Sequence, residues 1–68
     1  MNEDNLNMEI RKFLKKVGIT SQRLIENIIY EADKNGSIKA GDEIELSMTL
    51  SIKNFQTSNS IDGKITIE

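Results

Sequence analysis

The sequence predicts an α+β domain in which a helical hairpin packs on a two-stranded antiparallel β-hairpin, in the order ααββ. Residues 5–17 and 20–35 carry apolar side chains at spacings of three and four, which is typical of helices. Residues 43–53 carry them at every second position, which is typical of a strand, and residues 60–68 alternate again. At 68 residues, we predict that positions 1–68 form one small domain.

The first predicted helix ends at a glycine. Asn2 or Asp4 suits its N-cap, because a short polar side chain there can accept a backbone N–H. Gly18 suits the left-handed residue that closes a helix. Its apolar side chains form one stripe: Leu6, Ile10, Phe13, Leu14 and Val17.

The second predicted helix begins at Thr20, with Ile19 and Leu24 at the spacing of a hydrophobic staple. Gly36 is its expected stop. Only two residues then separate the helices, so they turn sharply against each other. In this arrangement Phe13 and Ile28 are buried between the helices and the sheet.

The stretch E-I-E-L-S-M-T-L-S-I-K, Glu43 to Lys53, is the first predicted strand, with one apolar and one polar face. We place the turn in residues 54–59 and the second strand at Ser60 to Glu68. A turn at Asp62-Gly63 is rejected because it leaves only a short tail, so Gly63 is expected at a bulge or a close approach.

Composition excludes several kinds of chemistry. The chain has no histidine and no cysteine, which removes most nucleophile–base pairs, disulfides and most metal sites. A calcium loop from Glu31 to Asp42 is disfavoured because a strand follows it, not a helix. We therefore expect no enzyme, no cofactor and no metal. The acidic, polar N-terminus and the lack of a long apolar run predict a soluble cytoplasmic protein without a membrane span.

A helix-turn-helix DNA reader is the alternative function. The opening of the second predicted helix could bring Gln22 and Arg23 to base edges. A basic cluster on the first helix could add phosphate contacts: Arg11, Lys12, Lys15 and Lys16. The net charge of −2 and the acidic later part of the second helix would repel phosphates, so nucleic acid is an unlikely partner.

Self-association is the favoured function, because so small a chain has little core and neither disulfide nor zinc to stabilise it. The centre of the first strand has no charge on its polar face, at Ser47, Thr49 and Ser51. A second copy could pair there antiparallel about Thr49, giving a homodimer through the sheet edge. The rival is a monomer in which the connection after Gly36 covers this strand. We thus expect a non-catalytic self-association or protein-interaction module whose protein partner is unknown.

Three stretches resemble a family of short bacterial proteins of unknown function. They are M-N-E-D-N-L-N-M-E-I-R-K-F-L-K-K-V-G-I-T-S-Q, M-T-L-S-I and I-D-G-K-I-T-I-E. The family shares this length, so the resemblance covers nearly the whole chain. It implies a single cytoplasmic domain with no known activity, and it transfers no catalytic or binding residue.

Overall fold

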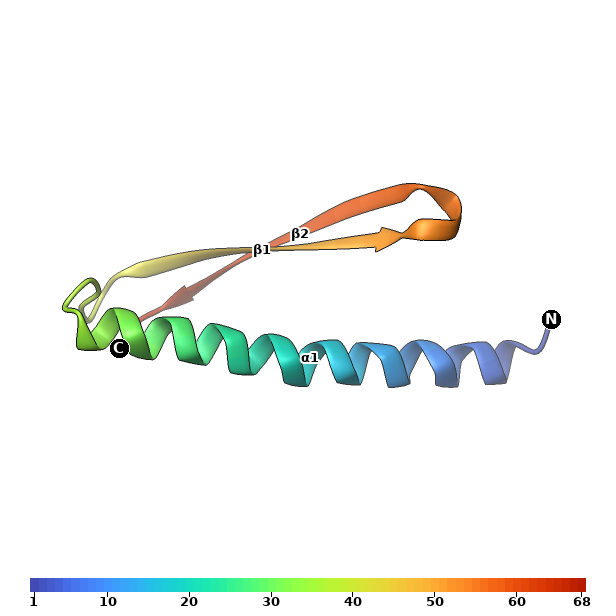
Figure 1. The fold of residues 1–68 in the computed structure, drawn as a ribbon, viewed down its shortest axis with the longest axis horizontal. Coiled ribbons are helices and arrows are strands. Elements are labelled where there is room, and N and C mark those ends of the chain that lie inside the picture. The colour runs from blue at the N-terminus through green and yellow to red at the C-terminus, as the bar shows by residue number, and fades with distance from the viewer. The chain divides into compact units, whose positions relative to one another are not determined.

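A computed structural model describes all 68 residues and contains a long α-helix followed by a β-hairpin (Figure 1). In chain order the elements are α1 (Glu3–Lys34), β1 (Glu43–Ile52), the short 3₁₀ helix η1 (Lys53–Phe55) and β2 (Thr57–Thr66). They fall into two compact units, Met1–Asn35 and Gly36–Glu68. The α+β class and the β-hairpin are confirmed, and each unit is described by itself below.

The predicted helical hairpin is wrong, because α1 is one helix of 32 residues. Gly18 and Thr20 lie inside it and neither ends nor caps a helix. The apolar spacing continues in phase across Gly18, through Val17, Ser21 and Ile25. A glycine within a helix costs only about 1 kcal/mol relative to alanine, and no proline interrupts the segment. The cost of Gly18 is therefore too small to break the helix.

Both ends of α1 follow the sequence prediction. The Asn2 side chain caps the start, with its Oδ1 accepting a hydrogen bond from the Asn5 N–H at 3.0 Å. At the other end Asn35 is the C-cap, and Gly36 follows with φ +70°, a value that glycine adopts without the strain of a side chain. The helix α1 therefore has a side-chain cap at its start and a glycine that ends it.

The β-hairpin pairs β1 and β2 antiparallel in an unbroken register from Glu43↔Thr66 to Ile52↔Thr57. The first strand lies where it was predicted. The second begins three residues before the predicted Ser60 and ends at Thr66, short of the predicted Glu68. Gly63 pairs with Leu46 inside this regular ladder, so the expected bulge is wrong.

Two connections shape the ends of the hairpin. At the tip, Gln56 takes a left-handed φ of 51° after η1, which turns the chain back. At the base, the Lys39 N–H donates to the Asp42 Oδ2 at 3.0 Å, and Gly41 has φ +95°. The Ile67 N–H donates to the Asp42 carbonyl at 2.8 Å, which extends the pairing by one position beyond the strands.

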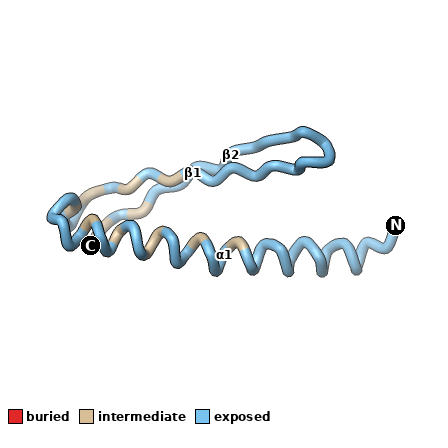
Figure 2. Tube along the Cα trace, in the orientation of Figure 1, coloured by how far each residue is buried: buried red, intermediate tan, exposed pale blue.

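Neither unit contains a buried side chain (Figure 2). Phe13 is 59% exposed and Ile28 69% exposed, so the prediction that both are buried is wrong. The reason is geometric, because a single helix without a second helix folded against it has nothing within its own unit to pack on. The apolar surface that the sequence predicts as core is accessible instead.

Candidate association surfaces

The hydrogen-bonding phase of the ladder determines which backbone groups of β1 face outward. In an antiparallel pair of strands, directly opposed residues alternate along the ladder. One pair exchanges backbone hydrogen bonds, and the next pair points its N–H and C=O groups away from the partner strand. The bond from Ile67 N–H to the Asp42 carbonyl makes that opposed pair a hydrogen-bonded one. The register is regular from there on, so the even-numbered residues of β1 bond to β2. The odd-numbered residues point their N–H and C=O groups away from β2.

The outward-pointing residues of β1 include the three that the sequence analysis selected: Ser47, Thr49 and Ser51. The sheet has only two strands, so β1 has no strand on its outer side. These three residues form what we call the β1 edge. All three are exposed and none carries a charge. The structure therefore places unpaired backbone donors and acceptors at the centre of the predicted dimer seam.

Charged side chains flank the β1 edge and do not cover its centre. On the polar face, Lys64 Nζ lies 3.8 Å from the Glu43 carboxylate near the base of the hairpin. At the centre, Thr49 Oγ1 and Ser60 Oγ lie 3.3 Å apart across the two strands. Edge strands are commonly protected from pairing by charges, and β1 has none at its midpoint.

The helix α1 carries a second accessible surface. At about 100° per residue, nine apolar residues and Ser21 lie within about 60° of one line along the helix. We call these ten residues the apolar stripe: Leu6, Ile10, Phe13, Leu14, Val17, Ser21, Leu24, Ile25, Ile28 and Ala32. Six of its large side chains are 40–69% exposed. Three polar residues lie on the same side of the helix: Glu3, Asn7 and Glu31. The predicted break at Gly18 divides this surface into two shorter stripes, although the spacing of three and four that indicates one continuous surface is already present in the sequence.

The predicted nucleic-acid residues all lie on this single helix. Gln22 and Arg23 are in its middle and do not open a recognition helix, so the helix-turn-helix geometry does not form. The basic cluster lies one to three turns before them: Arg11, Lys12, Lys15 and Lys16. Lys12 is engaged with Glu9 at 3.9 Å. Over its length α1 has six acidic and six basic residues, so the helix as a whole is neutral.

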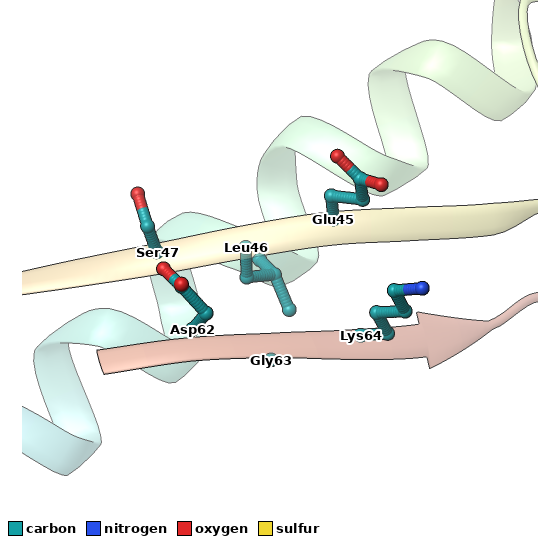
Figure 3. A pocket seen from close by; sticks show the side chains of 6 residues that line it. All are labelled: Glu45, Leu46, Ser47, Asp62, Gly63 and Lys64. Carbon is teal, nitrogen blue, oxygen red and sulfur yellow. The ribbon is translucent and has the colours of Figure 1, made fainter. Parts of the chain in front are cut away.

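An open hollow lies midway along the hairpin, where Gly63 has no side chain (Figure 3). It is lined by six residues: Glu45, Leu46, Ser47, Asp62, Gly63 and Lys64. Glu45 is paired with Lys64, and Ser47 with Asp62, across the two strands. No hydrogen bond joins a nucleophile to a base among these six residues.

The structure contains no cluster of three or more carboxylate, imidazole or thiol side chains arranged as metal ligands. Its one long helix lacks the apolar length that crossing a bilayer requires.

Comparison with known proteins gives a family match. The model of DUF6494, a family of unknown function, matches residues 1–68. No curated protein and no solved structure matches the chain.

Proposed function

We propose that this chain, which belongs to DUF6494, a family of unknown function, is a non-catalytic self-association module in which two copies pair through the β1 edge. The observation that carries this proposal is the ladder phase, which leaves the backbone groups of Ser47, Thr49 and Ser51 pointing outward from an open, uncharged edge.

A two-fold axis at Thr49 gives a consistent pairing. Reversing β1 about this residue sets Thr49 opposite its copy and Ser47 opposite Ser51. All three are outward-pointing residues, so each opposed pair can exchange hydrogen bonds. The same register brings Glu45 of one copy to the end of β1 in the other, where Lys53 begins η1, so unlike charges lie near each other at both ends of the seam.

The energy of this seam is modest. Three opposed pairs exchange about six hydrogen bonds, each contributing roughly 1 kcal/mol net. Association costs about 4–15 kcal/mol in lost translational and rotational freedom. Edge pairing therefore supplies the register and orientation, and a stable dimer also needs apolar surface to be covered.

Two proline variants test the β1 edge. Thr49→Pro removes an outward N–H from β1, while Ser60→Pro, its matched control, removes an outward N–H from the free edge of β2. Both lose the same Thr49–Ser60 side-chain contact. We expect Thr49→Pro to lower the mass at about 100 μM to that of a monomer and Ser60→Pro to leave a dimer. Circular dichroism checks that both keep their strands.

A Thr49→Pro variant that remains fully dimeric would contradict pairing through β1. Loss of the dimer only in Ser60→Pro would indicate that the two copies pair through β2. A parent chain that is monomeric at this concentration would overturn the proposed function itself.

A further inference from the structure

We propose that the apolar stripe of α1 is covered by α1 of a second copy, packed antiparallel and crossing near Ser21. This inference rests on the proposed function, since it names the second contact that the self-associating module uses. It differs from the β1 edge in the residues it needs, so the two can be tested separately.

A second α1 has the same length as the surface it covers. Thirty-two helical residues span about 48 Å at 1.5 Å each.

The centre of the stripe matches itself when it is reversed about Ser21. This operation sets Leu14 opposite Ile28 and Val17 opposite Ile25, while Ser21 meets its own copy. Large side chains then oppose large ones on either side of a small residue at the crossing, which allows close approach of two helices.

Charge on α1 is segregated in the way that an antiparallel pair needs. Residues 11–16 contain four basic side chains and no acidic one, whereas residues 26–33 contain three acidic side chains and no basic one. Antiparallel packing brings the basic segment of each copy to the acidic segment of the other. Parallel packing in register would set basic against basic, so the charge pattern selects the antiparallel orientation.

Each contact is two-fold symmetric by itself. β1 pairs antiparallel about Thr49, and α1 packs antiparallel about Ser21. Residues 36–42 connect the two elements and contain two glycines with positive φ, Gly36 and Gly41.

Cysteine cross-linking tests the crossing point, because the chain has no cysteine of its own. A disulfide needs Cα atoms within about 7 Å, so only residues on the line of contact form one. We expect Ser21→Cys to give a covalent dimer on mild oxidation of the full chain. The control Arg23→Cys lies on the polar side of α1 and should remain monomeric on a denaturing gel.

A mixed pair of variants tests the orientation. Leu14→Cys and Ile28→Cys, oxidised together, should form a disulfide between different chains, and each alone should form little. Disulfides between two copies of the same variant, with none between a Leu14→Cys chain and an Ile28→Cys chain, would indicate parallel packing and overturn the proposal. A protein that sediments as a dimer but gives no Ser21 cross-link would also overturn it, while leaving the β1 edge in place. A monomeric parent would overturn both proposals.

Discussion

Gly18 is the residue at which the predicted helical hairpin fails, because it lies inside α1. As the end of a helix it would need φ above zero, and replacing it with alanine would destabilise the protein. Inside α1 it has an ordinary helical φ, and a Cβ there would meet nothing within 4 Å. We expect Gly18→Ala to raise the free energy of unfolding by about 0.5–1 kcal/mol in urea titration. Gly36→Ala, at φ +70°, is the contrasting variant and should lower it.

Gln56 is the only residue other than glycine with a positive φ, at 51°. A side chain in this conformation costs roughly 1 kcal/mol, which glycine avoids. We predict that Gln56→Gly stabilises the hairpin, seen as a higher unfolding midpoint. Its control is Gln22→Gly, in the middle of α1, which should lower the midpoint by a similar amount. A lower midpoint for Gln56→Gly would mean that this turn conformation is not adopted in solution.

At the scale of the elements, the sequence pattern correctly predicted the features that depend on residues close together in the chain. Strict alternation placed β1, and a cap and a glycine placed the two ends of α1, because each depends on residues close in sequence. The prediction that a helix ends at Gly18 was wrong. Glycine can end a helix, but here the apolar spacing of three and four continues through it and the helix does too. The β1 edge was predictable from its uncharged centre, whereas its outward backbone phase requires the register, which sequence alone does not determine.

The continuity of α1 also affects the expected affinity for nucleic acid. With no recognition helix and a neutral α1, we expect mixed-sequence DNA to bind no tighter than the non-specific range of about 10⁻⁴ M at physiological salt. Fluorescence anisotropy measures this directly. Micromolar binding that disappears in the double variant Gln22→Ala, Arg23→Ala would instead support the nucleic-acid alternative.

At the scale of the whole molecule, stability should depend on protein concentration, because the chain has no buried core of its own. Phe13 lies on the apolar stripe and is 59% exposed, while Met8 lies on the other side of α1 and is 56% exposed. We expect Phe13→Ala to lower the unfolding midpoint more at about 100 μM than at about 1 μM. Met8→Ala should have a small effect at both, and equal effects of the two variants would count against a role for the stripe.

The central claim is that this chain completes its fold by pairing with a second copy. Sedimentation equilibrium of the unmodified protein at about 100 μM tests it most directly, because mass is measured without any assumption about the surface used. The claim predicts a species of twice the 7.7 kDa chain that dissociates on dilution. A single species of 7.7 kDa at every concentration would contradict it.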